Sequence, residues 1–310
     1  MIVVWGSATD PPVELVLEAL ASLDARVAHV DDAVLAALEY DVSLGVRPSG
    51  WMQLNGRRVD VAEISSMYLR PTHAAGRGAT AAAMMAALAS SLPGCIVNRP
   101  VAGRSNWSKP YQLTLLAAAG FLVPDTLVTT DPVAAKAFLA RHRHIVYKSV
   151  SGIRSIVATI DERHPARLDD LGVGPVQFQQ WIDGIDVRVH VVGDRWFATE
   201  VASGADDYRY PAAGDAAFDM RAADIPAELG TRLVEVTQAM GLVLSGIDLR
   251  RTTGGEWCAF EVNPSPGFSF YEEGTGQPIA DAIAGVLIGA AAEPTRGSGR
   301  GMSDLVAWEP

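Results

Sequence analysis

The segment GIDLRRTTGGEWCAFEVNPSPG, residues 246–267, constrains the fold more than any other part of the chain. It predicts two strands joined by a two-residue turn at Gly254-Gly255, because a primed turn requires positive φ values that glycine adopts at little cost. With that turn, Asp248 lies directly opposite Glu261, and Asn263 shares their face because side chains alternate along a strand. The other face carries an apolar set suited to a core: Ile247, Leu249, Cys258, Phe260 and Val262.

Two facing acids need an explanation. Facing Cβ atoms in an antiparallel pair are roughly 4.5–5.5 Å apart, and like charges at that distance are destabilising. A hard divalent cation between the carboxylates removes this cost, since it takes oxygen ligands from Asp, Glu and the Asn amide. We therefore predict that Asp248, Glu261 and Asn263 are metal ligands. The alternative is a solvated face on which the two acids lie unpaired.

The composition indicates a soluble globular protein of about two domains, since 310 residues exceed one ordinary core. Hydrophobic residues make up 49% of the chain and charged residues 20%, which leaves ample material for that core. The net charge of -11 disfavours general binding to nucleic acids or anionic membranes. We therefore predict neither as a partner.

The cysteines and the N-terminus bear on localisation. Cys95 and Cys258 show neither metal-ligand spacing nor a disulfide framework, which fits two core thiols in a reducing cytosol. The N-terminus lacks a basic segment followed by an apolar run, and no apolar stretch reaches membrane-spanning length. The sequence therefore predicts a cytoplasmic protein.

The first part of the chain alternates strand-like and helix-like segments, which predicts a parallel sheet in an α/β fold. The expected strands are MIVVW, ARVAHV and SSMYLRP. The expected helices are PPVELVLEALASL and ATAAAMMAALASSL, the second closed by Pro93-Gly94. We predict that residues 1–97 form a small doubly wound domain.

The rest of the chain predicts helices mixed with hairpin strands. SKPYQLTLLAAAGF is expected to form a helix with Ser108 as its N-cap, Pro110 in its first turn and Gly120 at its end. Two strands around a tight turn are expected in RHRHIVYKSVSGIRSIVATI, and further strands in VQFQQWIDGIDVRVHVVGDRWFATEVA. PAELGTRLVEVTQAMG and GQPIADAIAGVLIGAAA are expected to be helical, and residues 293–310 have the composition of a flexible tail.

Several cations are candidate anion ligands. Lys148 precedes a glycine-containing turn, where an ammonium and backbone N–H groups together suit a phosphate; an outward-facing strand lysine is the alternative. Lys109, Arg188, Arg209 and Arg250 have the same two interpretations, anion ligand or solvated surface charge. Among the arginines only Arg250 has a positional argument, because it shares the face of the paired acids. The six histidines show no ligand spacing, and we expect them at the surface.

The order of these segments resembles the ATP-grasp superfamily from Asn98 to Ile288, above all RimK-like carboxylate–amine ligases and the maturases that make microviridin-type (graspetide) crosslinks. GIDLRR followed by FEVNPSPG resembles the metal signature of the family and is the most specific piece. SKPYQLTLLAAAGFLVPDT and IVYKSVSG resemble the segments that carry two ATP-binding lysines. FQQWIDGIDVRVHVVGD resembles the adenine-binding hinge, and DDYRY resembles the loop whose arginine approaches the phosphates.

The resemblance implies an ATP-grasp fold of class α/β (α+β), with the small domain at 1–97, ATP-clasping subdomains at 98–182 and 183–292, and the tail. It implies ATP and two Mg²⁺ ions, replaceable by Mn²⁺, with the metal bound by the three hairpin ligands named above. The implied ATP-binding residues are Lys109, Lys148, Ser151, Gly152, Gln179, Gln180, Trp181, Ile182, Asp186 and Arg209. The implied catalytic residues, which stabilise the transferring phosphoryl group, are Arg188, Arg209 and Arg250.

Two features of the chain depart from the family pattern. The hinge usually carries an acid where this chain has Gln180, but adenine is held there largely by backbone groups, so we expect binding to survive. The maturases often carry Gly-Gln-Trp after their Asn-Pro, whereas this chain has SPGFSFYEEGTGQP. On the other hand, SMYLRP and GTGQPIADAIAGVL resemble the maturases, so the subfamily stays open.

Three functions follow from the resemblance. The first is a RimK-like ligase that uses Mg-ATP and an acyl phosphate to join a carboxylate to an amine of an amino acid or peptide. The second is a maturase that forms side-chain lactams or lactones within a precursor peptide. The third is a non-catalytic ATP-binding module, which the intact set of acids and lysines disfavours. The resemblance also implies a homo-oligomer, a dimer or a tetramer.

Overall fold

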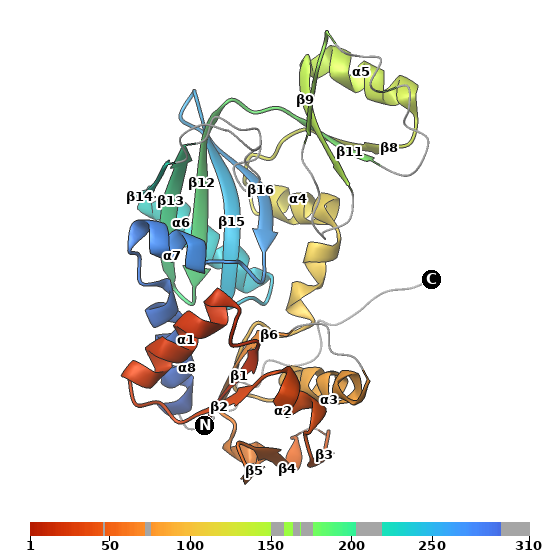
Figure 1. Cartoon of the computed structure of the whole chain (residues 1–310). Helices are drawn as coiled ribbons and strands as arrows, with labels where there is room; N and C mark the ends of the chain where they lie inside the picture. Colours follow the sequence, from red (N-terminus) through yellow and green to blue (C-terminus); the bar gives the residue numbers. More distant parts are fainter. Residues whose placement is uncertain are drawn as a thin grey trace.

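The computed structural model describes residues 1–45, 47–71, 76–149, 158–163, 168, 176–202 and 219–292 (Figure 1). Three sheet-based parts follow one another in space. A parallel sheet near the N-terminus lies at one end, a five-stranded sheet lies in the middle, and a smaller four-stranded sheet lies at the far end (Figure 1).

The N-terminal sheet is parallel, as the alternation of strand and helix segments predicts. Its strand order is β2 (Val27–Val30), β1 (Ile2–Gly6), β6 (Ser66–Arg70) and β7 (Cys95–Val97). The α1 helix (Pro11–Ser22) packs into the core on one face, and α3 (Arg77–Ser91) packs into the core on the other. The sheet is therefore doubly wound, and its central strand β1 is an apolar run because it is buried on both faces.

A small sheet and two short helices between β2 and β6 are absent from the sequence prediction. They are α2 (Asp32–Ala36), β3 (Tyr40–Ser43), β4 (Ser49–Leu54), β5 (Arg57–Asp60) and the 3-10 turn η1 (Val61–Glu63). Met52 and Leu54 of β4 are buried in the same core as α3. This region covers the α3 side of the N-terminal sheet, and its short, half-exposed strands carry too few apolar residues to show a clear period.

The last described helix returns to the first sheet. The α8 helix (Ile279–Ala292) packs beside α1, and Ile283 and Leu287 are fully buried in a core shared with Val13 and Leu20. Ser66 Oγ on β6 donates a hydrogen bond to the carbonyl of Leu287 at 2.9 Å. The two ends of the described chain thus build one core, while the division at residues 97, 182 and 292 stays a prediction.

The connection to the next part follows the predicted capping. After the 3-10 segment η2 (Ala102–Trp107), the α4 helix (Lys109–Ala118) begins where the Ser108 Oγ accepts the backbone N–H of Tyr111 at 3.3 Å. A proline in the first turn costs no helical hydrogen bond there. Gly120 follows with φ of 79°, which ends the helix as expected.

A helix covers one face of the smaller four-stranded sheet. Its order is β10 (Ala158–Asp161), β9 (His144–Ser149), β11 (Val176–Gln180) and β8 (Thr126–Thr129), all antiparallel. The α5 helix (Pro132–His142), which the sequence analysis did not predict, packs against it through Phe138 and Leu139 onto Ile145 and Phe178. Because side chains alternate along a strand, the residues next to Ile145 and Phe178 in sequence lie on the face of the sheet away from α5.

The five-stranded sheet is antiparallel and has two different faces. Its order is β14 (Asp219–Ala223), β13 (Arg195–Ala202), β12 (Gly184–Val192), β15 (Leu244–Thr252) and β16 (Trp257–Asn263). The α6 helix (Ala227–Ala239) buries Leu233 against Val189, Ile247 and Val262 on one face. The short α7 helix (Ser269–Thr275) places Tyr271 over the other face, beside Arg188. None of the described helices is long and apolar enough to cross a membrane.

The β15–β16 hairpin has the predicted pairing but not the predicted turn. The Thr252 N–H donates to the carbonyl of Glu256 at 2.8 Å, and Gly255 has φ of 85°, so the loop is three residues long rather than two. This shifts the register by one residue near the turn. A bulge between Asp248 and Leu249 shifts it back, and Asp248 still lies opposite Glu261.

The bulge also changes which residue enters the core. Ala259 is fully buried among the core side chains, whereas Phe260, which we expected there, is only half-buried and lies beside the Arg250 guanidinium. The predicted apolar face is therefore wrong at Phe260 and at Cys258, which is buried but pairs with Arg250 on the opposite face. The remaining members of that face are buried in the core as expected: Ile247, Leu249 and Val262.

Candidate functional site

Two cross-strand rows of polar residues lie on the five-stranded sheet, on the face away from α6. In the first row, Arg188 of β12 pairs in register with Asp248 of β15, which pairs with Glu261 of β16. In the second row, His190, Gly246 and Asn263 occupy the equivalent positions. Because these residues sit on adjacent strands of one sheet, the predicted metal ligands come together on a rigid support.

Each acid of the first row has a cation beside it. The Arg188 Nη1 lies 2.5 Å from the Asp248 Oδ1, and the Lys109 Nζ of α4 lies 3.1 Å from the Glu261 Oε2. The four side chains are 5%, 20%, 8% and 13% exposed, so water screens these pairs weakly. The facing acids therefore tolerate each other through their own ion pairs, and repulsion alone does not require a metal ion.

Gly246 makes room for the Arg188 guanidinium. A Cβ atom at Gly246 would lie 2.3 Å from the Nη2 of Arg188, closer than atoms can approach. The guanidinium thus lies over the glycine, and the Tyr271 ring centroid is 5.7 Å from its Cζ. Because Gly246 has no side chain, the Arg188 guanidinium can lie at this position. Its ion pair with Asp248 then fixes the orientation of that carboxylate.

The oxygen donors of the two rows fit a hard divalent cation. Asp248 and Glu261 supply carboxylates, and Asn263 supplies an amide oxygen, Oδ1, that also accepts the backbone N–H of Ser265 at 2.9 Å. Mg²⁺ prefers such oxygen ligands and is commonly bound through one or two carboxylates together with substrate phosphates. Within the described parts of the chain no group of three or more His, Cys, Asp or Glu residues offers another metal site.

Arg250 turns away from the first row. Its Nε and Nη2 donate to the two carboxylate oxygens of Asp186 at 2.7 Å and 3.0 Å, and its Nη1 donates to the Ile182 carbonyl at 2.7 Å. The guanidinium also lies 5.1 Å from the ring centroid of Trp181. Arg250 therefore braces the segment between β11 and β12, where the sequence predicts the adenine-binding hinge.

The smaller sheet presents a second group of predicted residues on its face away from α5. Lys148 of β9 is 7% exposed and lies directly opposite Gln177 of β11, and Gln179 donates from its Nε2 to the Thr126 Oγ1 at 3.2 Å. In Figure 1 this face is turned toward the rest of the molecule. The predicted lysine and hinge residues thus lie on a different sheet from the metal ligands.

The hinge itself is ordered by backbone contacts. The Gln180 N–H donates to the Asp125 carbonyl at 2.9 Å, and the Gln180 side-chain oxygen accepts the Asp125 N–H at 3.4 Å. The Trp181 ring stacks on His144 with centroids 4.5 Å apart. Gln180 therefore uses its side chain within the small sheet, at the position where the family usually has an acid.

Gln177 is one of two buried polar side chains of the site region that were not predicted from the sequence. It is fully buried, and neither its Oε1 nor its Nε2 has a hydrogen-bond partner among the described residues. In the sequence, Gln177 and Gln179 flank the apolar Phe178 on one predicted strand, and this alternation placed both glutamines on the same face. An unsatisfied buried amide is uncommon in native proteins and calls for an explanation such as a ligand or a water molecule.

His190 is the second missed residue, and it contradicts the expected surface location. It is fully buried, neither ring nitrogen has a hydrogen-bond partner in the part of the chain that the structure describes, and its ring centroid lies 4.8 Å from that of Tyr271. Burial, together with the nearby Arg188 charge, lowers the pKa of His190 well below its ordinary value. The ring is therefore neutral near pH 7, and its position between Val189 and Val191 was the sequence signal for burial.

Some predicted residues lie outside the described part of the chain. They are Ser151, Gly152 and Arg209, and the tail at 293–310 lies outside it as well.

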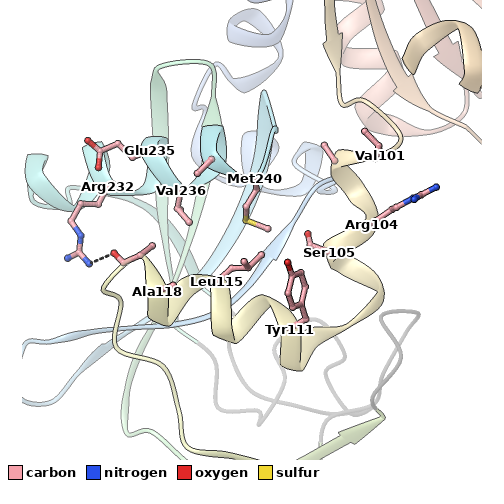
Figure 2. A pocket seen from close by; sticks show the side chains of 13 residues that line it. Val101, Arg104, Ser105, Tyr111, Leu115, Ala118, Arg232, Glu235, Val236 and Met240 are labelled. Atoms are coloured by element: carbon pink, nitrogen blue, oxygen red, sulfur yellow. Dashed lines mark hydrogen bonds between the residues drawn. The ribbon is translucent and has the colours of Figure 1, made fainter. Parts of the chain in front are cut away.

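A surface pocket of about 680 Å³ between α4 and α6 is separate from these residues (Figure 2). Its walls are mostly apolar, including Leu115, Val236 and Met240, with Arg104 and Glu235 among its charged members. No predicted site residue lines it.

Comparison with known proteins identifies the family. A model of the RimK-like ATP-grasp domain matches residues 107–287, which include every described residue of the predicted site. The chain belongs to the RimK-like ATP-grasp family. The predicted family, fold class and enzyme class are thereby confirmed, and the protein is an ATP-grasp ligase.

Relatives of this RimK-like ligase cover different shares of its length. A probable alpha-L-glutamate ligase from Vibrio cholerae serotype O1 is 29% identical over 218 residues, which are 66% of this chain and 71% of the relative. The ATP-grasp ligase PsnB, solved with a minimal precursor, Mg and ADP, is 26% identical with a TM-score of 0.77, over 94% of this chain and 97% of that chain.

A third comparison extends the likeness of fold. The macrocyclase MdnC from Microcystis aeruginosa MRC, solved with the precursor peptide MdnA, has a TM-score of 0.76 and 21% identity over 93% of this chain and 100% of that chain. The RimK-like ligase thus shares its fold over more than nine-tenths of its length with two proteins that were solved in complex with peptides.

Proposed function

We propose that this protein uses Mg-ATP to phosphorylate a carboxylate of a precursor peptide and then joins the acyl group to a nucleophile of the same peptide. The first step transfers the γ-phosphoryl group of ATP to the carboxylate oxygen, which gives an acyl phosphate and ADP. In the second step an amine or hydroxyl attacks the acyl carbon, and inorganic phosphate leaves. The product is a side-chain lactam or lactone.

The cross-strand row on the five-stranded sheet is the observation that carries the chemistry. Within it, Arg188 and Asp248 form one weakly screened ion pair, and Glu261 forms a second with Lys109 of α4. Phosphoryl transfer depends on positioning and on charge stabilisation rather than on covalent help from the protein. A row of fixed charges of both signs on one sheet meets that need, because it requires no rearrangement at the moment of transfer.

Each residue of the row has a proposed part in that step. Asp248, Glu261 and Asn263 would hold Mg²⁺, two ions in our proposal, with Mn²⁺ as a substitute. When bound, the metal supplies Lewis-acid charge that neutralises the terminal phosphates. Arg188 would stabilise the oxygens of the phosphoryl group during transfer, and Lys109 would orient Glu261 and contact a phosphate.

The smaller sheet would hold the rest of the nucleotide. Lys148 would contact phosphate, while Gln179, Gln180, Trp181 and Ile182 would border the adenine, largely through backbone groups. Asp186 would accept hydrogen bonds from the ribose hydroxyls, and its bidentate contact with Arg250 holds it in place for that. Arg250 is thus proposed as a support for the hinge in place of its predicted role at the phosphoryl group.

Three further predicted residues complete the proposal. Ser151, Gly152 and Arg209, which lie outside the described residues, would contact the phosphates of ATP. Their part rests on the family resemblance.

The peptide substrate is supported by the extent of the structural likeness. PsnB and MdnC, both solved with precursor peptides, match more than nine-tenths of this chain in fold with TM-scores of 0.77 and 0.76, and the glutamate ligase relative matches 66% of it in sequence. That relative nevertheless favours a second candidate, the addition of an amino acid to a carboxylate. A dimer or tetramer remains our expectation for the assembly.

Product mass separates the two candidates. ADP release with Mg-ATP would be measured against pooled amino acids, dipeptides and acidic peptides, followed by mass spectrometry of every responding pool. A peptide that loses one water from itself supports the maturase. A product one water lighter than the sum of two components supports amino-acid ligation. ADP binding without ADP release from any pool, including candidate precursor peptides, would contradict both.

A further inference from the structure

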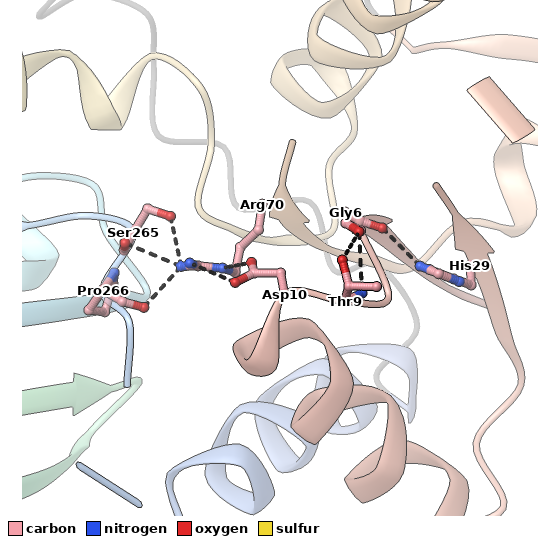
Figure 3. A network of polar contacts seen from close by, with 8 residues as sticks. Gly6, Thr9, Asp10, His29, Arg70, Ser265 and Pro266 are labelled. Carbon is pink, nitrogen blue, oxygen red and sulfur yellow. Dashed lines mark hydrogen bonds and ion pairs between the residues drawn. The ribbon is translucent and has the colours of Figure 1, made fainter. Parts of the chain in front are cut away.

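The loop that follows Asn263 is held by two side chains from outside the five-stranded sheet. The Nδ2 of Asn98 donates to the Pro264 carbonyl at 2.6 Å. The Nη1 of Arg70 donates to the Ser265 and Pro266 carbonyls at 3.2 Å and 2.9 Å (Figure 3). Three successive backbone carbonyls are therefore fixed, although nothing in a hairpin end requires such contacts.

Arg70 is itself anchored in the N-terminal part. It ends β6, and its Nε donates to the Asp10 Oδ2 at 2.6 Å, just before α1 begins (Figure 3). Its Nη1 also donates to the Ser265 Oγ at 3.0 Å. One guanidinium thus serves two groups on opposite sides, a geometry that depends on its planar fork and that a lysine ammonium cannot reproduce.

The held loop leads directly to a proposed metal ligand. The Ser265 N–H donates to the Asn263 Oδ1 at 2.9 Å, and this hydrogen bond fixes the orientation of the Asn263 amide. A chain of hydrogen bonds thus runs from Asp10 through Arg70 and Ser265 to Asn263. Arg70 and Ser265 are 195 residues apart in the sequence. A shift of Ser265 would therefore change the orientation of the Asn263 amide oxygen, which shares a sheet face with Asp248 and Glu261.

We infer that Arg70 is a positioning residue through which the N-terminal sheet sets the geometry of the metal site. It holds the Ser265–Pro266 backbone, which in turn aims the Asn263 oxygen. This inference rests on the proposed function, because it takes Asn263 as a metal ligand. Supporting residues of this kind are known to change metal affinity substantially even though they never touch the ion.

Metal affinity, measured without turnover, tests the inference. Calorimetric titration of Mn²⁺ into the full chain saturated with ADP would be compared for wild type and Arg70→Lys. We expect binding to weaken about 10-fold in the variant, in line with the loss of an outer-shell partner. The matched control is Arg26→Lys, since Arg26 forms an exposed ion pair with Glu63 in the same part of the fold. That control should bind Mn²⁺ like wild type.

A double-mutant cycle separates positioning from a general loss of stability. In an Asn263→Ala background the amide oxygen is gone, so Arg70→Lys should no longer change Mn²⁺ affinity. Asp10→Asn provides a milder perturbation that weakens the anchor but keeps its shape, and a smaller loss of affinity in the same direction is expected. Equal further weakening by Arg70→Lys in both backgrounds would overturn the inference.

The outcomes also distinguish this inference from the proposed function. If wild type binds ADP and Mn²⁺ but Arg70→Lys and Asp10→Asn bind equally well, only the positioning role is wrong. A lower unfolding temperature with unchanged Mn²⁺ affinity leads to the same conclusion, since it reveals a purely structural contact. If wild type binds no Mn²⁺ with ADP, the proposed metal site and this inference fail together.

Discussion

The polar faces of the two sheets that carry the candidate site differ in how their buried groups are satisfied. On the five-stranded sheet, Asp248 and Glu261 each form an ion pair, and the nearby Gln112 forms hydrogen bonds with both the N–H and the carbonyl of Val262. On the smaller sheet, the buried amide of Gln177 has no hydrogen-bond partner within the described ranges. Among the described residues, both acids of the first face are paired without a ligand, and its unfilled hydrogen-bonding capacity lies at the Arg188 Nε and the His190 ring, whereas on the second face a whole side-chain amide is unfilled.

This difference has a physical meaning. Charges that react must be held in place before the substrate arrives, because reorganising them during the reaction would cost free energy. Groups that recognise a neutral base can instead form their hydrogen bonds only when the base binds. In the free protein their donors and acceptors are then unpaired, which costs free energy. We therefore interpret the large sheet as the preorganised chemical side and the small sheet as the side completed by the nucleotide.

The largest expected effect concerns the preorganised row. Glu261→Gln removes a metal ligand and the partner of Lys109, so ADP formation should fall by more than about 100-fold, or roughly 2.7 kcal/mol of transition-state stabilisation. Initial rates of Mg²⁺-dependent ADP release would measure this. Glu256→Gln, an exposed position on the same hairpin, is the control and should keep wild-type rates. Wild-type turnover in Glu261→Gln would show that the row is not the reactive centre.

His190 is the exception on the large sheet, and pH probes it. The pKa of His190 is lowered in the folded state, so as the pH falls through about 6.5 the ring is protonated in the unfolded chain but stays neutral in the folded protein. The contribution of His190 to the unfolding free energy is therefore fully present above that pH. It decreases as the pH falls, by up to about 1.4 kcal/mol per pH unit.

Urea unfolding between pH 7 and pH 5 checks this for wild type and His190→Leu. The difference in unfolding free energy between the two should change with pH in the stated direction, because the titration of all other groups cancels in it. A difference independent of pH would mean that His190 is hydrated or partnered in solution.

Two glutamines compare the faces directly. Gln177→Leu removes an unsatisfied amide and should raise the unfolding free energy of the ligand-free protein by about 1 kcal/mol, while ADP binding weakens about 5-fold. Gln112→Leu, an equally buried change on α4 beside the five-stranded sheet, should instead lower stability by about 1–3 kcal/mol, because it leaves the Val262 backbone without its Gln112 hydrogen bonds. Chemical unfolding and calorimetry measure both. If both changes destabilise the protein equally, the contrast between the faces is wrong.

The smallest effect is expected at the hinge. Gln180→Glu restores the acid that the family usually carries, but the side-chain oxygen can still accept the Asp125 N–H. ATP affinity should therefore change by less than about 2-fold, a smaller free-energy change than the loss of one hydrogen bond would cause. Gln179→Leu, one residue earlier, is the informative comparison, since it removes a side-chain donor on the face away from α5. A large gain in affinity for Gln180→Glu would assign adenine recognition to that side chain.

Part of the site was predictable because it depends on local periodicity. Alternation along one hairpin placed Asp248 opposite Glu261, and Ser108 with Pro110 marked the start of the helix that carries Lys109. The turn was predicted with the wrong length, and the pairing survived only because a bulge compensates for it. No local pattern distinguishes a two-residue loop from a three-residue loop with a bulge, since both use the same glycines.

The sequence by itself determined the strands and helices with strong patterns, the acid pair, the family and the class of enzyme. Only the tertiary structure decided the partners: Lys109 with Glu261, Arg250 with Asp186, and Arg70 with Ser265. It also decided that α8 completes the N-terminal core and that His190 is buried. The physical reason is range, because alternation acts between neighbours along one strand, whereas ion pairs and burial depend on which distant segments the packing brings together.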